Sequence, residues 1–404
     1  MSSILKFILV FILICQIKLL FSQNYKIDGK IITAKDIKTG ADQTEVYLPL
    51  LKNKQIGIVS NQTSLIGKMH LIDSLLSLKI NIKKVFCPEH GFRGDSEAGA
   101  KIENNIDSKT NLPIISLYGK NKKPGKADLN GLDIVIFDIQ DVGVRFYTYI
   151  STLHYVMEAC AENNIQLIVF DRPNPNGYYV DGPVLDPKFS SFVGMHKVPI
   201  VHGMTIGEYA EMINGEKYLS NQLKCNLKVV KVLNYSHKDY YILNVKPSPN
   251  LTNMNAVYLY PSLCLFEGTV MSIGRGTSKP FQIIGHPLLE NTDYSFTPAS
   301  IKGMSENPPY KGEICNGYDL SEFSTAILRS EAKLNLFWLI DTYKRLFNKT
   351  KFFNDFFDKL AGNDLLRKQI IEGKSEEEIK SSWETDLKVF KDIRKKYLLY
   401  PDFE

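Results

Sequence analysis

The amino-acid sequence predicts an α/β protein built around a parallel sheet. Between residues 55 and 170, short apolar runs rich in β-branched residues alternate with stretches that have helical periodicity. The runs are almost continuously apolar, which is typical of strands that are covered on both faces. Polar clusters that contain Gly and Pro separate the runs from the helical stretches. A chain that alternates strand and helix in this way forms a doubly wound α/β domain.

Five strands and two helices are expected in this region. The helices are residues 71–78 and 149–163, and the second has Ile150, Leu153 and Cys160 at helical spacing on one face. The strands are residues 56–60, 83–87, 113–117, 133–138 and 166–170.

The pattern changes after about residue 219. A strand at residues 227–232 is followed by an aromatic loop, a long irregular stretch and a helical tail over residues 319–400. We therefore expect a first domain at residues 45–219 and a smaller α/β domain with a helical tail at residues 220–404.

Residues 1–22 resemble a secretory signal peptide, because Lys6 precedes an apolar run from Phe7 to Cys15. This run is shorter than the roughly 20 apolar residues that a membrane-spanning helix needs. We expect cleavage after Ser22, export to the periplasm or the medium, and no stable membrane insertion of the mature chain. An uncleaved membrane anchor is the alternative.

Composition and motifs exclude several classes of function. The chain has 49 Lys and Arg against 44 Asp and Glu, a net charge of +5 without a long basic block, so we expect no nucleic-acid partner. No G-x-S-x-G elbow and no G-x-x-x-x-G-K phosphate loop is present. Five cysteines follow residue 22 without a pairing pattern, so no disulfide framework is expected. Cys87 and His90 lack a second ligand pair, and we expect neither a metal nor an organic cofactor.

Polar and ionisable side chains gather at the predicted carboxyl ends of the strands. In a parallel sheet these ends meet at one edge, where such folds bind their ligands. Carboxylates with arginines and aromatic residues at a cleft are typical of sugar recognition and of glycosidic-bond cleavage. The candidates at this edge are Asn61, Glu89, His90, Arg93, Asp138, Asp141, Arg145, Tyr147, Asp171, Arg172 and Asn174.

Each of these residues also has a structural interpretation. A single acid after a strand can cap a helix or form a turn. Arg172 can brace the neighbouring Asp171. His202 stands before a predicted helix, where Thr205 and Glu208 form an S/T-x-x-E capping box, so Glu208 is interpreted as structural. For the acids and arginines, both interpretations stay open at this point.

The chain resembles the family of NamZ-type exo-β-N-acetylmuramidases over nearly all of residues 50–400. The resemblance rests on a series of motifs in a fixed order. They are PEHGFRG at residues 88–94, SLYG at 116–119, FDIQDVGVRFYTY at 137–149, DRPNPNG at 171–177, HGMT at 202–205, PSPN at 247–250, EGT at 267–269, GRGT at 274–277 and YLLY at 397–400.

The resemblance implies an enzyme that removes N-acetylmuramic acid from the non-reducing end of peptidoglycan fragments, so its partners are peptidoglycan-derived sugars or muropeptides. It implies a Rossmann-like N-terminal domain, a smaller C-terminal domain and an active site in the cleft between them. Glu89 is then the favoured catalytic acid, with His90, Asp138 and Asp141 as further catalytic candidates. The implied substrate-binding residues are Asn61, Arg93, Arg145, Tyr147, Asp171, Arg172, Asn174, His202, Glu267 and Arg275.

Substrate recognition depends on an arginine in this interpretation. We expect one of Arg93, Arg145, Arg172 and Arg275 to hold the lactyl carboxylate that distinguishes muramic acid from N-acetylglucosamine, with Arg145 and Arg275 as first candidates. A guanidinium binds a carboxylate through two parallel hydrogen bonds. Two other functions stay open. A non-catalytic exported sugar- or muropeptide-binding protein would not turn over a muramic acid glycoside, and an esterase or amidase would release acetate or peptide.

Overall fold

The computed structural model describes residues 25–27, 30–32, 36–89, 91–92, 105–348 and 350–404. The expected signal peptide and the candidates His90 and Arg93 lie outside these residues. None of the helices in the described part of the chain has the length and apolar character of a membrane span. At its start, the short strands β1 (Tyr25–Ile27) and β2 (Lys30–Ile32) pair antiparallel with each other.

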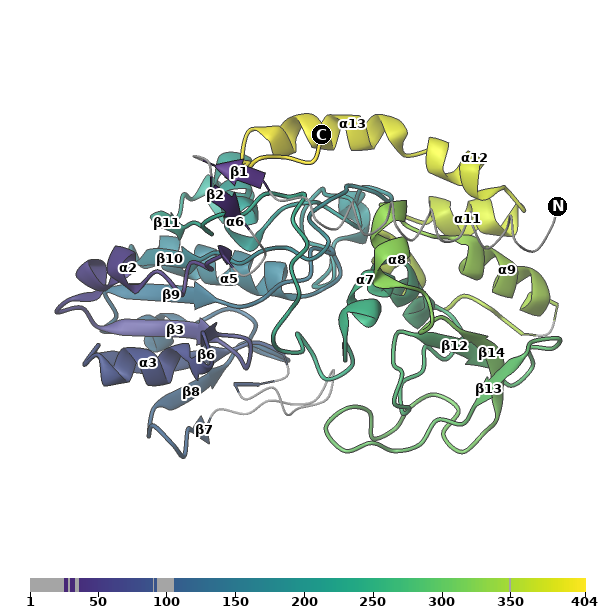
Figure 1. The fold of residues 1–404 in the computed structure, drawn as a ribbon, viewed down its shortest axis with the longest axis horizontal. Helices are drawn as coiled ribbons and strands as arrows, with labels where there is room; N and C mark the ends of the chain where they lie inside the picture. Colours follow the sequence, from purple (N-terminus) through teal and green to yellow (C-terminus); the bar gives the residue numbers. More distant parts are fainter. Residues whose placement is uncertain (1–24, 28–29, 33–35, 90, 93–104, 349) are drawn as a thin grey trace.

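A seven-stranded, mostly parallel sheet forms the centre of the N-terminal half (Figure 1). Neighbouring strands are parallel except for one antiparallel pair, β7 with β8. In spatial order the strands are β11 (Leu227–Val230), β10 (Gln166–Phe170), β9 (Ile134–Asp138), β3 (Ile56–Ser60), β6 (Ile82–Cys87), β8 (Pro113–Ser116) and β7 (Asn105–Ile106). Counted along the chain, the parallel strands have the order 3-2-1-4-5-6, which is that of doubly wound nucleotide-binding sheets.

The five strands expected from the sequence are all present. β3 and β10 have the expected bounds, and the other three differ by one residue. The strand near residue 227 is also present, but its expected place in the second domain is wrong. β11 pairs in parallel with β10, so the first sheet extends past residue 219. The physical reason is that β10 would otherwise leave a row of backbone groups unpaired at its outer edge.

Helices cover both faces of this sheet. The helix α2 (Thr44–Leu51) precedes the first strand of the sheet. The elements that connect its strands are the hairpin of β4 (Leu65–Ile66) and β5 (Met69–His70), α3 (Leu71–Ser77), α4 (Lys126–Leu129), α5 (Tyr149–Glu162), η2 (Pro187–Phe189), α6 (Ile206–Gly215) and η3 (Ser220–Gln222). Alternate side chains of a strand point to opposite faces. Ile134 and Ile136 of β9 belong to a core with α2 and α3, whereas Val135 and Phe137 belong to a core with α5 and α6. The predicted α/β class with a large parallel sheet is confirmed.

The C-terminal half contains a small antiparallel sheet and a series of helices (Figure 1). Its hydrophobic residues continue the core of α5 and α6. The sheet has the order β12 (Ile283–His286), β14 (Cys315–Asp319), β13 (Tyr294–Phe296), and the helices are α7 (Met254–Leu263), η4 (Cys264–Gly268), α8 (Thr325–Glu331), α9 (Phe337–Leu346), α10 (Phe357–Ala361), α11 (Leu365–Ile371), α12 (Glu376–Ser381) and α13 (Glu384–Lys395). The helical tail predicted for residues 319–400 is confirmed.

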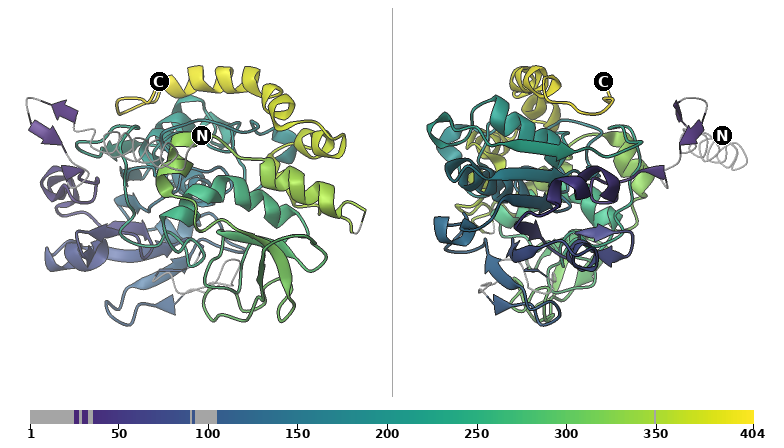
Figure 2. Two further views of the ribbon diagram at one scale, coloured as in Figure 1. Left: turned by 45° about the vertical axis from the view of Figure 1, so that its right-hand side comes forward. Right: turned by 90° about the vertical axis from the view of Figure 1, so that its left-hand side faces the viewer.

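The end of the tail returns to the N-terminal half, and α13 lies along one side of the molecule in both views of Figure 2. The hydroxyl group of Tyr400 donates to the Asp171 carboxylate and accepts from the backbone N–H of Val232 at 2.9 Å. The backbone N–H of Leu399 donates to Oε1 of Glu208 at 2.8 Å. The tail therefore supplies hydrogen-bond partners to buried acids of the first sheet and of α6.

Candidate active site

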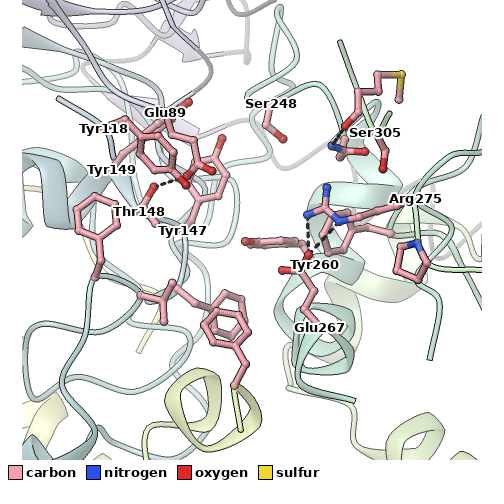
Figure 3. Close-up of a pocket in the computed structure, with 18 of the residues that line it drawn as sticks. Glu89, Tyr118, Tyr147, Thr148, Tyr149, Ser248, Tyr260, Glu267, Arg275 and Ser305 are labelled. Carbon is pink, nitrogen blue, oxygen red and sulfur yellow. Dashed lines mark hydrogen bonds and ion pairs between the residues drawn. The ribbon is translucent and has the colours of Figure 1, made fainter. Parts of the chain in front are cut away.

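A cavity of about 460 Å³ lies beyond the carboxyl ends of β6, β8 and β9 (Figure 3). We call it the main pocket. Its volume is within the range of roughly 300–1,000 Å³ that is typical of small-molecule sites. The N-terminal half contributes Glu89, Tyr118, Tyr147, Thr148 and Tyr149 to its lining, and the segments beyond β11 contribute Ser248, Asn250, Tyr260, Glu267, Arg275, Phe281 and Ser305, among others.

Glu89 is the carboxylate on the sheet side of the main pocket. It follows the end of β6 by two residues and is half-buried. The hydroxyl group of Thr148, at the N-terminus of α5, donates to Oε2 of Glu89 at 3.0 Å. Tyr118, just after β8, also hydrogen-bonds to Glu89, and burial together with this carboxylate raises the pKa of the Tyr118 phenol. Tyr118, after β8, and Thr148, at the start of α5, thus hold the Glu89 carboxyl group at the pocket wall.

Two tyrosines connect the sheet edge to a loop beyond β11. The hydroxyl groups of Tyr147 and Tyr149 both donate to the carbonyl oxygen of Pro247, at 2.8 and 3.3 Å. The side-chain amide of Gln62 donates to the same oxygen at 3.2 Å. Asn61 donates from Nδ2 to the Tyr149 hydroxyl at 2.9 Å. The loop that follows Pro247 is therefore fixed to the wall of the main pocket.

Arg275 and Glu267 lie across the main pocket from Glu89 (Figure 3). Nε and Nη2 of Arg275 donate to Oε1 of Glu267 at 3.0 and 2.6 Å. The guanidinium lies 5.2 Å from the centre of the Phe281 ring. Burial acts to lower the pKa of Arg275, but the Glu267 carboxylate outweighs burial and raises that pKa. Arg275 is thus a cation held in a fixed orientation, at a turn whose two flanking glycines have positive φ.

A third group of polar residues completes this side of the pocket. Asn250 donates from Nδ2 to the carbonyl oxygen of Met304 at 3.0 Å. Its Oδ1 is buried and has no hydrogen-bond partner among the described residues. Ser248 and Ser305 lie on the same side of the pocket (Figure 3). These groups offer donors and acceptors to the hydroxyl or amide groups of a ligand.

Asp138 and Arg172 do not line the main pocket. They form a buried ion pair in which Nε–Oδ1 is 2.6 Å and Nη2–Oδ2 is 2.9 Å. Burial alone would lower the pKa of Arg172, but the Asp138 carboxylate outweighs burial and raises it. The predicted catalytic role of Asp138 and the predicted substrate-binding role of Arg172 are therefore not supported in the main pocket, because the two charged groups bind each other. Arg172 lines a different cavity, of about 430 Å³, with Thr63 and Tyr241.

Asp171 is a buried cap of α6. Its carboxylate accepts from the Thr205 hydroxyl at 2.7 Å, from the backbone N–H of Gly207 at 2.8 Å and from Tyr400. Burial raises the pKa of Asp171 to about 6, against the opposing effect of these hydrogen bonds. The prediction that Asp171 lines the substrate site is wrong. The predicted capping box of Thr205 and Glu208 on the same helix is confirmed.

Arg145 is fully buried, away from the main pocket. Nη1 donates to the carbonyl oxygens of Pro183 and Val198, both at 2.9 Å. Nη2 donates to the carbonyl oxygens of Leu360 and Ala361, at 2.8 and 2.7 Å. Burial lowers the pKa of Arg145 to about 9. The prediction that Arg145 holds a substrate carboxylate is wrong, because four backbone carbonyls already occupy its guanidinium.

Asp141 is buried in the loop after β9, outside the main pocket. Its Oδ1 accepts from the backbone N–H of Gly143 at 2.7 Å. Its Oδ2 has no partner within the described part of the chain. Burial raises the pKa of Asp141 to about 7. The predicted catalytic role of Asp141 is not supported, because this carboxyl group shapes the loop instead of facing the cavity.

The remaining predicted residues have structural partners. Asn174 donates from Nδ2 to the carbonyl oxygen of Met204 at 2.8 Å and packs against Gly143, where a Cβ atom would clash with it. His202 accepts from the backbone N–H of Met204 at 3.2 Å, and burial lowers its pKa to about 3. Asn61 approaches the pocket only through Tyr149, so substrate contacts by these three residues are not supported.

The main pocket therefore brings together part of the predicted set and adds residues that were missed. The predicted residues that line it are Glu89, Tyr147, Glu267 and Arg275. His90 and Arg93 lie outside the described residues and stay predictions. The missed residues Tyr118, Thr148, Tyr149, Ser248 and Asn250 all belong to motifs of the sequence, which is the signal that could have identified them.

Within the part of the chain that the structure describes, no group of three or more His, Cys, Asp or Glu side chains could hold a metal ion. Cys87, which the sequence predicts to be a buried strand residue, is the fully buried last residue of β6, as predicted. The ionisable groups of the main pocket are two carboxylates, an arginine and several tyrosines.

Open α/β sheets bind their ligands outside the carboxyl ends of the strands, where the main pocket lies, and carboxyl groups are the catalytic groups of most glycoside hydrolases. Family models make the assignment specific. The N-terminal model of exo-β-N-acetylmuramidase NamZ matches residues 56–255, and the C-terminal model matches residues 258–400. The chain belongs to this family, which confirms the resemblance seen in its motifs.

Individual relatives agree with this assignment. Over 397 residues the chain is 40% identical to peptidoglycan β-N-acetylmuramidase NamZ of Bacillus subtilis strain 168, covering 92% of this chain and 94% of that protein. A crystal structure of a DUF1343 family protein from Bacteroides fragilis NCTC 9343 has a TM-score of 0.85 and 50% identity, over 91% of this chain and 99% of that one. A second DUF1343 structure from the same strain has a TM-score of 0.75 and 30% identity, over 90% of this chain and 99% of that one.

Proposed function

We propose that this protein is an exo-acting glycoside hydrolase that releases N-acetylmuramic acid from the non-reducing end of peptidoglycan fragments. Its family and the name of its Bacillus relative support the reaction. The observation that carries the proposal is the composition of the main pocket, in which Glu89 lies opposite Arg275 and Glu267 (Figure 3). One cavity thus offers a carboxyl group for acid catalysis and a cation for an anionic sugar.

Glu89 acts as the general acid in this proposal. Hydrolysis of a glycosidic bond needs a proton for the leaving oxygen, and a carboxylic acid at the bond supplies it. The hydroxyl groups of Thr148 and Tyr118 hold the Glu89 carboxyl group. Tyr147 and Tyr260, whose rings are 5.8 Å apart, contribute aromatic surface to the pocket, against which a sugar ring can pack.

Arg275 binds the lactyl carboxylate of muramic acid in this proposal. Its Nε and Nη2 are oriented by Glu267, whereas Nη1 has no hydrogen-bond partner among the described residues. The N–H groups of Nη1 can therefore donate to a ligand carboxylate. A charge-assisted hydrogen bond of this kind is worth roughly 1.5 to 3 kcal/mol, which corresponds to about a ten- to hundredfold preference for muramic acid over N-acetylglucosamine.

The proposal also includes the architecture and the location of the enzyme. The N-terminal half is a Rossmann-like domain, the C-terminal half is a smaller domain, and the active site is the cleft between them. The enzyme is exported to the periplasm or the medium, in agreement with the signal-like residues 1–22. If so, N-terminal sequencing of the chain recovered from its host begins at Gln23, and an intact Met1 would contradict cleavage.

The first test is hydrolysis of a disaccharide in which N-acetylmuramic acid is joined β-1,4 to N-acetylglucosamine. The wild type is expected to release both sugars, and Glu89→Gln to lower kcat by about 10² to 10⁴ because the proton donor is lost. Glu313→Gln, an exposed acid outside the main pocket, is the control and keeps wild-type turnover. Binding of the disaccharide without turnover by the wild type would instead support a sugar-binding protein.

The second test separates recognition from catalysis. We expect Arg275→Lys to lower the ratio of kcat/KM on the 4-nitrophenyl glycosides of N-acetylmuramic acid and N-acetylglucosamine about ten- to a hundredfold. Arg367→Lys is the matched control, since Arg367 holds Asp358 through Nε and Nη2 at 2.8 and 2.7 Å outside the main pocket. Equal wild-type rates on the two glycosides would overturn the muramidase assignment.

A further inference from the structure

Thr148 occupies the N-cap of α5 but does not cap it. An N-cap threonine ordinarily accepts a hydrogen bond from a backbone N–H of the first helical turn. The Thr148 side chain makes no such bond, and its backbone is already in the right-handed helical region. Its hydroxyl group instead donates to Oε2 of Glu89 at 3.0 Å, across 59 residues of sequence. This hydroxyl group therefore binds a residue of the main pocket instead of capping the helix.

Tyr118 approaches the same carboxyl group from a different element. It follows β8, the strand beside β6, and it lines the main pocket together with Glu89 and Thr148 (Figure 3). The phenol hydrogen-bonds to Glu89 and is partly buried. Two hydroxyl groups from separate elements thus fix where the carboxyl group lies and how its plane is turned.

We propose that Thr148 is a positioning residue for Glu89, whose hydroxyl group holds the carboxyl group through Oε2 in the orientation that delivers the catalytic proton to the leaving sugar. The inference rests on the proposed role of Glu89 as the general acid. Proton transfer needs the acid within hydrogen-bond reach of the leaving oxygen, so it depends on how the plane of the carboxyl group is turned. Thr148 therefore fixes the orientation from which the proton is delivered to the leaving sugar.

This role predicts an effect that depends on the leaving group. A sugar hydroxyl is a poor leaving group and needs the proton, whereas 2,4-dinitrophenolate leaves without one, so acid catalysis matters far less for the aryl glycoside. A variant that misdirects the proton therefore loses activity on the disaccharide and keeps it on the aryl glycoside. A variant that loses activity through misfolding or poor substrate binding is impaired on both substrates.

The experiment compares Thr148→Val with Thr148→Ser on the muramic acid disaccharide and on 2,4-dinitrophenyl β-N-acetylmuraminide. Thr148→Val keeps the shape of the side chain and removes the hydroxyl group, and kcat on the disaccharide is expected to fall about tenfold or more. On the aryl glycoside we expect a loss of less than about threefold. Thr148→Ser keeps the hydroxyl group and is expected to restore most of the disaccharide activity.

Thr152→Val is the matched control. Thr152 lies one turn further along α5, is buried, and its hydroxyl group bonds to the carbonyl oxygen of Thr148 at 3.3 Å, outside the main pocket. Its turnover of both substrates is expected to stay near that of the wild type. Tyr118→Phe is the second variant if Thr148→Val folds poorly, and it is expected to show the same dependence on the leaving group.

Equal losses on both substrates for Thr148→Val and Tyr118→Phe would overturn the positioning role, as would a Thr148→Ser variant as impaired as Thr148→Val. Failure of the proposed function itself gives a different result. In that case the wild type cleaves neither substrate, or Glu89→Gln cleaves the disaccharide at the wild-type rate.

Discussion

Two sets of ionisable residues lie near the carboxyl edge of the same sheet and have opposite environments. The first, which we call the bracing set, consists of Asp138, Arg145, Asp171 and Arg172. All four are buried, and their partners are backbone groups, hydroxyl groups or one another. The second, the pocket set, consists of Glu89, Glu267 and Arg275, which border a cavity and keep part of their surface exposed.

The difference shows that charged residues in a motif do not all have the same task. FDIQDVGVRFYTY contains Asp138 and Arg145 of the bracing set together with Tyr147 and Thr148 of the main pocket. A polar residue at a strand end either holds the edge in shape or faces the ligand. The two roles can be separated by substitution. Replacing a residue of the bracing set is expected to lower stability, whereas replacing a residue of the pocket set is expected to change turnover or selectivity.

The largest effect on stability is expected for Arg145→Met. The variant removes the guanidinium donors of four buried carbonyl oxygens, of which only that of Val198 keeps another donor, the backbone N–H of Leu185, in the described residues. Each carbonyl left without a donor costs about 1 to 3 kcal/mol, so the free energy of unfolding falls by roughly 5 kcal/mol. Urea denaturation measures it. Arg275→Met is the counterpart in the pocket set and is expected to change stability by less than about 1 kcal/mol. Similar stability of the two variants would remove the distinction between the sets.

Asp138→Asn is expected to have the next largest effect. It leaves the Arg172 guanidinium buried without a counter-charge, which typically costs about 3 to 5 kcal/mol. The fraction that remains folded should keep the wild-type preference for muramic acid over N-acetylglucosamine, since neither residue lines the main pocket. A change in this preference with unchanged stability in urea would return Asp138 to the list of catalytic candidates.

The contribution of Asp141 to the free energy of unfolding is expected to depend on pH. Its pKa of about 7 in the folded protein lies above the unfolded value of about 3.9. Between these two pH values the folded state therefore keeps a proton that the unfolded state has lost. This contribution to stability is complete below about pH 4 and is lost as pH rises through about 7, by up to about 4 kcal/mol. Unfolding in urea at pH 5 and pH 8 should show a smaller loss for Asp141→Asn than for the wild type. An identical loss in both proteins would contradict the raised pKa.

The smallest effect on stability is expected for Glu267→Gln. The Arg275–Glu267 pair is partly exposed, with side-chain exposures of 19% and 26%, and such pairs contribute about 1 kcal/mol or less. The selectivity for muramic acid should nevertheless fall several-fold, because Arg275 loses the carboxylate that orients it. A thermal melt and the ratio of kcat/KM on the two glycosides measure both. Lower stability with unchanged selectivity would place Glu267 in the bracing set.

Much of the fold follows from local sequence, but the separation of the two sets does not. β3 and β10 could be predicted to the residue because their apolar runs have sharp polar ends. The place of β11 could not, because pairing with β10 is a contact over 60 residues of sequence. Arg145 and Arg275 both occur in glycine-containing turns, and two of the four carbonyls that bind Arg145 come from residues 360 and 361, over 200 positions away. No local pattern distinguishes the two arginines.

The attachment of the C-terminal tail has a consequence for synthesis on the ribosome. Asp171 and Glu208 emerge early, but the Tyr400 hydroxyl and the Leu399 N–H that satisfy them are translated near the end of the 404 residues. At about 5–20 residues per second, the sheet waits roughly 10 to 35 s after β11 for these partners. During that interval the nascent chain holds buried acids with incomplete hydrogen bonding, so synthesis of residues 399 and 400 completes the hydrogen bonding of the N-terminal half.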